Sequence, residues 1–240
     1  MIIDKHTNYG YIAYYENDMA FADSIKNGKI YEEDFVLRHL QKYIMDSEVI
    51  LDIGSHAGSH TVLYKHINPY AKIYCFEPQK KMFDLLTHNI QSNKFKHVEA
   101  FNVGVANIST EAEMNDSIQE TGKIIAYGGK QRVNLGGMQI GSGGEKIHTI
   151  TIDSLNLKSC DFIKIDVEGF EPLVLMGGEQ TIKKFKPIIL FESNYKKMSK
   201  QSAEKFKVSY PPKESAEILK DYGYKDIKLI DNLWNYLAIY

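Results

Sequence analysis

The pattern of apolar and polar residues divides most of the chain into alternating strands and helices. In several segments apolar residues recur every three or four positions, which is the spacing of one buried helix face. The predicted helices are 32–44, 60–67, 80–91, a segment that ends at 181–185, and 214–224. Short apolar runs between them suit buried strands. The predicted strands are 49–54, 72–78, 97–105, 160–169 and 187–193.

Helices that separate successive strands indicate a parallel sheet with helices on both faces. The last two strand-like runs, 225–230 and 234–240, lie close together in the sequence and suit an antiparallel hairpin. The length of 240 residues fits one domain. We therefore expect a single α/β domain, in which 1–46 form an N-terminal cover with a helix and 47–240 form the core.

Composition and charge narrow the function classes. Hydrophobic residues make up 43% and charged residues 25%, and the net charge of −2 gives no overall field that would recruit nucleic acid or an anionic membrane. The longest apolar runs are too short to span a bilayer, and the N-terminus does not resemble a secretory signal. Cys75 and Cys160 sit inside strand-like runs and are interpreted as buried thiols in a reducing compartment, so we expect a cytoplasmic protein.

The stretch VILDIGSHAGSHT (49–61) carries a glycine loop between a strand and a helix. In a parallel sheet, ligands bind beyond the carboxyl ends of the strands. Gly54 permits a tight turn, and Gly58 lets the helix start close to a ligand. No lysine follows Gly58, and His56 stands where the dinucleotide fingerprint has glycine. The loop therefore matches neither a P-loop nor a dinucleotide site.

Two acids indicate which ligand the loop binds. Asp52 precedes the loop, which disfavours a pyrophosphate and suits an ammonium or sulphonium. Glu77 ends the second strand, 23 residues after Gly54, where a carboxylate can accept both ribose hydroxyls. A nucleoside with a cationic amino-acid tail, S-adenosylmethionine, fits these features. The alternative is that Asp52 caps a helix and Glu77 is a surface acid.

Charged residues alternate with apolar ones in the fourth predicted strand. The apolar set is Ile163, Ile165 and Val167, and the charged set is Lys164, Asp166 and Glu168. A central parallel strand should be apolar on both faces, so these charges require a role. At the carboxyl end they would point into the ligand crevice, where Lys164 and Asp166 could pair. Glu192, at the end of the next strand, would face the same crevice. The alternative is an edge strand with one solvated face.

Four segments of the chain resemble the FkbM family of S-adenosylmethionine-dependent methyltransferases. They are ILDIGSHAGSHT, CFEPQ, TIDSL and FIKIDVEGFEPLVLMGG, and the resemblance runs from about residue 33 to 192. KIDVEG is the most specific signature, whereas the glycine loop alone indicates only a class I methyltransferase. The resemblance implies a Rossmann-like, mostly parallel sheet of seven strands with one antiparallel strand, and O-methylation of hydroxyls on sugars or natural products.

The resemblance also implies which residues contact the cofactor. The implied contacts are Asp52, Gly54, Ser55, Gly58, Glu77 and Pro78, with Asn102 and Val103 beside the adenine. His56 departs from the family pattern, in which a smaller or amide residue is expected, and it is a candidate for substrate binding.

Methyl transfer to a hydroxyl needs a group that removes the proton, and a carboxylate in the crevice can act as this general base. Asp166 is the first candidate and Glu192 the second. Lys164 or Glu168 would orient the base or bind substrate hydroxyls. Alternatively, Asp166 and Glu192, with Glu168, would hold a divalent metal ion, because hard cations prefer oxygen ligands. No spacing demands a metal, so it is not favoured.

The glycine-rich stretch 127–144 is interpreted as a hairpin with a mobile loop, in which Arg132 and Asn134 reach substrate oxygens; a disordered surface loop is the alternative. Aromatic residues within 8–21 are interpreted as core or cover. His56 and His60 have zinc-like spacing but no third ligand, so they are expected to line the crevice. Lysines within 183–207 are interpreted as solvated helix faces rather than a nucleic-acid site.

The sequence as a whole favours an O-methyltransferase that acts on a sugar or oligosaccharide. The alternatives are a methyltransferase for natural products, nucleic acid or protein, and a cofactor-binding module without catalysis. No feature predicts a membrane span or an oligomeric state.

Overall fold

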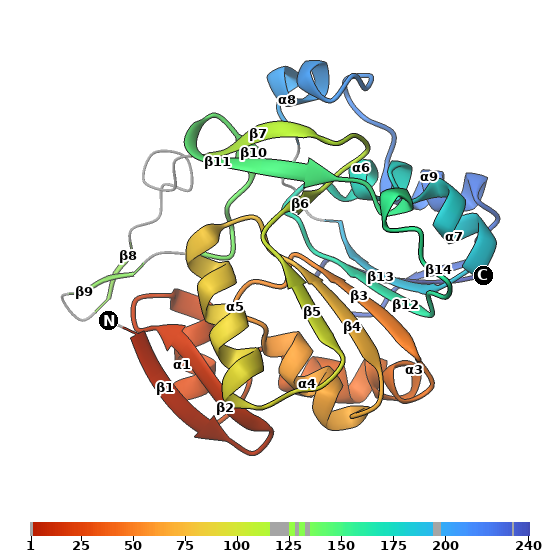
Figure 1. The fold of residues 1–240 in the computed structure, drawn as a ribbon. Coiled ribbons are helices and arrows are strands. Elements are labelled where there is room, and N and C mark those ends of the chain that lie inside the picture. Colours follow the sequence, from red (N-terminus) through yellow and green to blue (C-terminus); the bar gives the residue numbers. More distant parts are fainter. Residues whose placement is uncertain (1, 116–124, 128–129, 133–134, 194–197, 232) are drawn as a thin grey trace.

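The computed structural model describes residues 2–240 except 116–124, 128–129, 133–134, 194–197 and 232 (Figure 1). Its centre is a seven-stranded sheet. In spatial order the strands are β14 (Asp226–Leu229), β15 (Asn235–Ile239), β13 (Ile188–Glu192), β12 (Phe162–Ile165), β3 (Val49–Ile53), β4 (Lys72–Phe76) and β5 (Val98–Phe101). β15 runs antiparallel to both neighbours, and the other adjacent pairs are parallel. The predicted sheet with one antiparallel strand is confirmed, as is the C-terminal hairpin.

Alternating side chains of the sheet enter two apolar clusters, one on each face. Ile50, Ile73 and Phe162 pack with α3 (Gln41–Met45), α4 (Ser59–Ile67) and α5 (Lys80–Ser92). Leu51 and Ile163 pack on the opposite face with α6 (Glu171–Met176), α7 (Glu179–Phe185) and α9 (Ser215–Asp221). The sheet is thus covered on both faces, as predicted (Figure 1).

β12 occupies an interior position of the sheet between β13 and β3. Phe162 and Lys164 are the partners of Ile50 and Asp52 in β3. The alternative of a solvated edge strand is therefore wrong. The strand is also shorter than the predicted 160–169, because the chain leaves the sheet after Ile165.

The predicted strand 97–105 divides into two, which corrects the prediction. β5 ends at Phe101, and β6 (Gly104–Val105) pairs with β11 (Gly143–Ile150) in a second sheet. The break has a visible cause: the side-chain amide of Asn102 donates to the backbone oxygens of Glu77 and Pro78, both at 2.9 Å. These bonds hold the chain at the end of β4 instead of continuing the ladder.

The second sheet has the order β10-β7-β11-β6. It includes β7 (Thr110–Asn115) and β10 (Ile140–Gly141), and α8 (Lys200–Lys205) packs near it through Ala203. The glycine-rich stretch begins in a small hairpin of β8 (Ile125–Tyr127) and β9 (Lys130–Arg132). The predicted hairpin is therefore present in part.

The N-terminal segment packs against α5. It comprises the hairpin β1 (Ile2–Thr7) and β2 (Gly10–Tyr15), then α1 (Met19–Lys26). The Asn89 side chain accepts a hydrogen bond from the backbone N–H of Ala13 at 2.6 Å and donates to its oxygen at 3.1 Å. Asn93 bonds the N–H and oxygen of Tyr11 in the same way, at 2.8 and 2.7 Å.

Residues 32–44, predicted as one helix, form three consecutive helical pieces. These are α2 (Glu33–Phe35), a π-helical turn (Val36–Leu40) and α3. A short 3-10 helix (Asp153–Leu155) precedes β12. The predicted helices 60–67, 80–91 and 214–224 correspond to α4, α5 and α9. None of the helices in the described ranges has the length and apolar character needed to cross a membrane.

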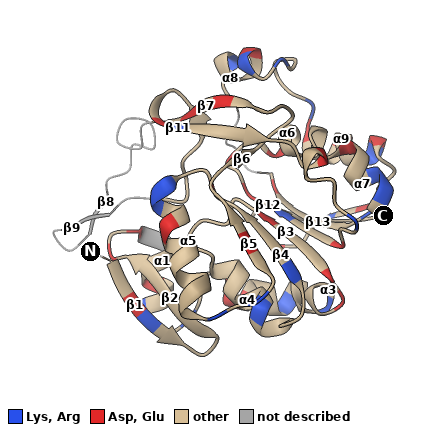
Figure 2. Cartoon of the chain, in the orientation of Figure 1, with Lys and Arg blue, Asp and Glu red and all other residues tan. Residues whose placement is uncertain are grey.

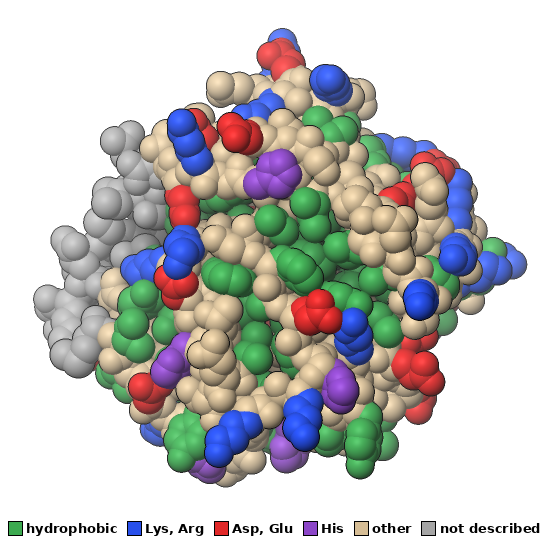
Figure 3. Space-filling view, in the orientation of Figure 1, with side chains coloured by type: hydrophobic (Ala, Val, Ile, Leu, Met, Phe, Trp, Pro, Cys, Tyr) green, Lys and Arg blue, Asp and Glu red, His purple; other side chains and the backbone are tan. Residues whose placement is uncertain are grey.

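Charged side chains of both signs are mixed along the described chain (Figure 2). The visible face shows no large area of one sign (Figure 3). On α7, for example, Lys183 pairs with Glu179 one turn earlier, at 2.5 Å. This supports the interpretation of the lysines on this helix as a solvated helix face.

Candidate cofactor site and active site

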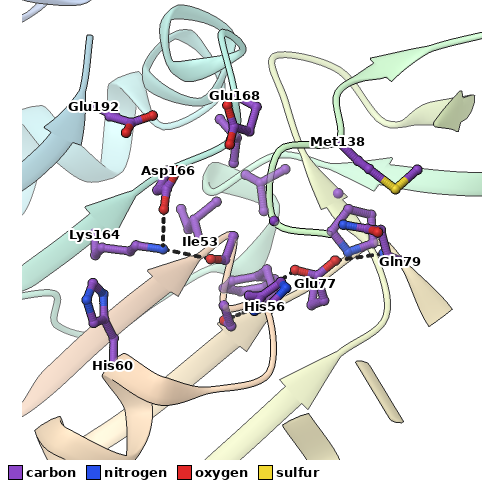
Figure 4. A pocket seen from close by; sticks show the side chains of 18 of the residues that line it. Ile53, His56, His60, Glu77, Gln79, Met138, Lys164, Asp166, Glu168 and Glu192 are labelled. Carbon is purple, nitrogen blue, oxygen red and sulfur yellow. Dashed lines mark hydrogen bonds and ion pairs between the residues drawn. The ribbon is translucent and has the colours of Figure 1, made fainter. Parts of the chain in front are cut away.

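A cavity of about 290 Å³ lies at the carboxyl edge of the central strands (Figure 4). Eleven residues predicted from the sequence contribute to its lining: Gly54, Ser55, His56, His60, Glu77, Pro78, Val103, Lys164, Asp166, Glu168 and Glu192. Other lining residues were not predicted as site residues, and they include Asp18, Phe21, Tyr31, Glu32, Gln79 and Trp234. The glycine loop, Glu77 after β4 and the charged segment after β12 (residues 166–168) therefore contribute to the lining of one cavity.

The glycine loop is packed tightly against the segment that follows β12. Gly54 has a φ of +79°, and a Cβ there would lie 1.8 Å from the backbone oxygen of Asp166. A side chain at this position is excluded by both conformation and space. The N–H groups of Gly54 and Ser55 both donate to the oxygen of Phe76 at 3.0 Å. The loop thus presents a fixed surface to the cavity.

Glu77 is held rigidly at the end of β4, with 4% of its surface exposed. Its carboxylate accepts hydrogen bonds from the backbone N–H groups of His56 at 2.9 Å and Gln79 at 2.8 Å. Burial raises the pKa of Glu77, although His56 and the two N–H donors act in the opposite direction. The alternative of a surface acid is wrong for this residue.

Lys164 connects the glycine loop to the charged segment. Its ammonium donates to the oxygen of Gly54 at 2.6 Å and lies 3.3 Å from the Asp166 carboxylate and 3.7 Å from that of Asp52. Burial alone would lower the pKa of Lys164, but the carboxylates of Asp166 and Asp52, with that of Glu32, raise it. Lys164 therefore remains a cation, and its predicted pairing with Asp166 is present.

Asp166, Glu168 and Glu192 bring one carboxylate oxygen each within 4.8 Å of one another. Glu168, in the turn that follows β12, adopts a left-handed backbone conformation with a φ of +58°. Burial raises the pKa of Glu192 well above its ordinary value, and the charges of Asp166 and Glu168 raise it further. Glu192 thus holds its proton to a higher pH than an ordinary glutamate does.

Glu171 supports the charged segment from the first turn of α6. One of its carboxylate oxygens accepts hydrogen bonds from the backbone N–H groups of Val167 at 3.1 Å and Gly169 at 3.2 Å. It is 5% exposed. Burial raises its pKa from 4.5 to about 7, against the effect of the N–H donors.

We expect Glu171→Gln to remove part of the pH dependence of stability. The native state holds the Glu171 proton up to about pH 7 and the unfolded chain only to 4.5, so the wild type loses stability as the pH rises between these values. Glutamine keeps an acceptor oxygen and does not ionise. In urea unfolding, the free energy of unfolding of the variant relative to that of the wild type should therefore rise by about 2 to 3 kcal/mol between pH 4 and pH 8. A difference that does not change with pH would contradict the assignment.

Three residues predicted to contact the cofactor do not line the cavity. Asp52 is fully buried and accepts a hydrogen bond from the hydroxyl of Thr61 at 2.7 Å, so it is not a helix cap either. Gly58 faces α5, where a Cβ would lie 2.7 Å from Leu86. Asn102 is engaged with backbone oxygens. The burial of Asp52 corrects its predicted contact, whereas the predicted contacts of Gly58 and Asn102 stay predictions.

Arg132 and Asn134 were predicted to bind substrate. Asn134 lies outside the described residues, as does the side chain of Arg132. Their predicted role therefore stays a prediction. His56 does line the cavity beside Glu77 (Figure 4), and its Nε2 lies 3.3 Å from the carboxylate of Asp18 in the N-terminal segment.

The N-terminal residues are those that sequence reasoning missed. Asp18 and Glu32 lie near the two histidines of the loop, with carboxylate oxygens 3.3 Å from Nε2 of His56 and 3.0 Å from Nε2 of His60. Phe21 packs edge-on against the His56 ring at 5.1 Å. No motif marks these acids, and only the predicted cover function of 1–46 pointed to the segment.

Comparison with known proteins gives the family. The methyltransferase FkbM domain matches residues 52–225. The hexuronic acid methyltransferase AglP of Haloferax volcanii is 27% identical over 162 residues, covering 66% of this chain and 61% of that protein. Methyltransferase 1 of Beauveria bassiana is 24% identical over 146 residues, covering 55% and 59%. The chain thus spans about three fifths of the length of these two relatives.

A solved structure of an FkbM methyltransferase from Methylobacillus flagellatus KT shares the fold. It superposes with a TM-score of 0.50 at 17% identity, covering 81% of this chain and 44% of that one. This agrees with the Rossmann-like class I architecture expected from the sequence. The domain match covers most of the chain, and it includes the loop after β3, Glu77 and the charged segment. The chain belongs to the FkbM methyltransferase family.

Proposed function

We propose that the protein is an S-adenosylmethionine-dependent O-methyltransferase that acts on a hydroxyl of a sugar or glycan. The observation that carries the proposal is one cavity that joins a buried, fixed carboxylate at Glu77 to a partly exposed carboxylate at Asp166, with a glycine loop between them. The family membership supports methyl transfer. The sugar is supported by the relative described as a hexuronic acid methyltransferase.

The cavity fits the proposed cofactor in shape and chemistry. Each oxygen of Glu77 accepts one backbone N–H and retains a lone pair for a ribose hydroxyl. Phe76, Val103 and Met138 provide an apolar lining that suits a flat base. When bound, the cofactor would supply an electrophilic methyl group on a sulphonium. The carboxylates of the lining suit that positive charge.

Asp166 is the group best suited to remove the acceptor proton. Its side chain is 43% exposed, so an acceptor can reach it, and its carboxylate lies 3.3 Å from the Lys164 ammonium. Glu192 holds its own proton near neutral pH and so would donate a hydrogen bond to the acceptor instead of removing its proton. Asp166 accepts the hydroxyl proton as the oxygen attacks and passes it to solvent afterwards.

Glu168 and Trp234 line the cavity near Glu192: the carboxylates of Glu168 and Glu192 lie within 4.8 Å, and the backbone oxygen of Trp234 accepts a hydrogen bond from the N–H of Ser193 at 2.9 Å. An indole ring offers a flat apolar surface to a sugar face, and carboxyl groups bind its hydroxyls. A screen of free sugars, nucleotide-linked sugars and oligosaccharides for labelled methyl transfer tests the proposal. We expect label in a sugar hydroxyl. Label only in protein or nucleic acid would contradict the acceptor class.

We expect turnover to persist after exhaustive chelation. The three clustered carboxylates form a donor set that a hard cation would accept, but Lys164 already provides a positive charge beside Asp166. The measurement is methyl transfer before and after EDTA treatment. Loss of activity that Mg²⁺ restores would assign Asp166, Glu168 and Glu192 to a metal site.

A further inference from the structure

Two carboxylates of the N-terminal segment point into the cavity from helix starts that they do not cap. Asp18 precedes α1 and Glu32 precedes α2, the usual places for a side chain that caps a helix, yet neither makes a capping hydrogen bond. Asp18 is 3% exposed. Both acids line the cavity instead. Two acids that do not serve their own helices are available for a ligand.

Each acid faces an imidazole of the glycine loop or of α4. The Nε2 atoms of His56 and His60 are buried, and carboxylate oxygens of Asp18 and Glu32 lie 3.3 and 3.0 Å from them, respectively. The two acids and the two imidazoles thus form adjacent pairs in the wall of the cavity, where a ligand with both an ammonium and a carboxylate would meet acceptors and donors together. His60 also lies in the first turn of α4, whose N-terminus favours negative charge.

The two histidines can be placed relative to the proposed ribose site and to Lys164. The backbone N–H of His56 donates to Glu77 at 2.9 Å, which places His56 next to the ribose carboxylate. His60 lies on the side of Lys164 (Figure 4). A chain that leaves the sulphur next to the ribose and runs along the glycine loop from Glu77 toward Lys164 would therefore pass the two pairs. The amino-acid tail of S-adenosylmethionine is such a chain, with one ammonium and one carboxylate.

We propose that this chain binds the amino-acid tail of its cofactor with two acid–histidine pairs, in which Asp18 and Glu32 bind the ammonium and His56 and His60 the carboxylate. The inference rests on the proposed function. It adds residues from outside the matched domain, which begins at residue 52, to the cofactor site. Burial lowers the pKa of His56, but the carboxylates of Asp18 and Glu77 raise it by more. The pKa of His56 is therefore above its ordinary value, which favours the protonated imidazole.

Three nucleosides separate the tail from the rest of the cofactor. S-adenosylhomocysteine carries the complete tail, S-adenosyl-3-thiopropylamine carries only the ammonium, and methylthioadenosine carries neither charge. Their dissociation constants are measured by calorimetry for the wild type, Asp18→Asn, Glu32→Gln and His60→Gln. Asp34→Asn is the matched control, because Asp34 lies in the same segment, pairs with Lys29 at 2.8 Å and does not line the cavity.

Each acid variant should bind S-adenosylhomocysteine and the thiopropylamine about tenfold or more weakly, and methylthioadenosine within about twofold of the wild type. His60→Gln should weaken only S-adenosylhomocysteine, and Asp34→Asn should weaken none. Thermal unfolding confirms that each variant is folded. If Asp18→Asn does not fold, the test relies on Glu32→Gln, because the side chain of Glu32 is 28% exposed.

Two results would overturn the inference and leave the proposed function standing. In one, the acid variants bind S-adenosylhomocysteine as well as the wild type does. In the other, they weaken methylthioadenosine equally, which would mean that the acids act on the shape of the cavity. Wild-type protein that binds none of the three nucleosides would overturn the proposed function and this inference together.

Discussion

Asp166→Asn should lower turnover by about two to four orders of magnitude and leave the affinity for S-adenosylmethionine within a few-fold. Asparagine keeps the shape and volume of the side chain but cannot accept the acceptor proton. Lys164 keeps its hydrogen bond to the Gly54 oxygen at 2.6 Å, so the loop should not shift. Single-turnover methyl transfer, with calorimetry for cofactor binding, measures the two effects separately.

Glu192→Gln is the matched control for this prediction. Because Glu192 already holds a proton near pH 7, glutamine should imitate it and retain turnover within about tenfold, the effect of one altered hydrogen bond. If Glu192→Gln abolishes turnover while Asp166→Asn retains it, Glu192 is the base. If neither substitution matters, the hydroxyl loses its proton by another route, and the proposed mechanism fails although the family assignment stands.

Glu77→Ala should weaken the binding of S-adenosylmethionine and its demethylated product by about 1.5 to 3 kcal/mol, or roughly 10- to 150-fold. The carboxylate is the proposed acceptor for both ribose hydroxyls. Its removal also leaves the buried N–H groups of His56 and Gln79 without their acceptor, so the melting temperature should fall as well. Calorimetry at a temperature where the variant is folded measures the affinity.

Glu145→Ala provides the comparison. Glu145 is an exposed acid whose carboxylate also accepts a backbone N–H, that of Lys80 at 3.2 Å, but it does not line the cavity. Its removal should leave cofactor affinity unchanged. A folded Glu77→Ala variant that binds the cofactor as well as Glu145→Ala does would show that the ribose is bound elsewhere.

Local sequence patterns predicted the parts of the site that lie at strand ends. A glycine directly after an apolar strand, an acid at the end of the next strand and charges in a buried strand each signal a ligand edge without further information. Gly54, Glu77 and Lys164 were found in this way. Asp166 followed because its strand had to be interior if the sheet was parallel.

The side chain of Asp52 was misplaced because strand parity was not applied to it. Ile50 and Asp52 lie two residues apart and share one face of β3. Ile50 belongs to the apolar cluster that packs against α4 and α5. The Asp52 carboxylate therefore points toward the same helices, where it accepts a hydrogen bond from the Thr61 hydroxyl. The parity was visible in the sequence. The register that places Asp52 opposite Lys164 was not, because pairing between strands so distant in sequence depends on the whole sheet.

The N-terminal acids could not be predicted for a related reason. Asp18 and Glu32 reach the cavity only because the hairpin of β1 and β2 docks on α5, about 70 residues further along the chain. The docking bonds come from asparagine side chains, which have no apolar periodicity to reveal them. The division of 97–105 into two strands likewise depends on one amide, that of Asn102.

The same asparagines have a consequence for how the protein behaves at high concentration. Two residues of β2, Tyr11 and Ala13, have both their N–H and oxygen occupied by Asn93 and Asn89, one helical turn apart on α5. These amides take the place of the backbone of a further strand. The N–H and oxygen groups of Tyr11 and Ala13 on this edge of the hairpin are therefore not available to pair with a strand of a second molecule. Self-association by strand addition is blocked there, and a chain lacking the two amides would expose an aggregation-prone edge.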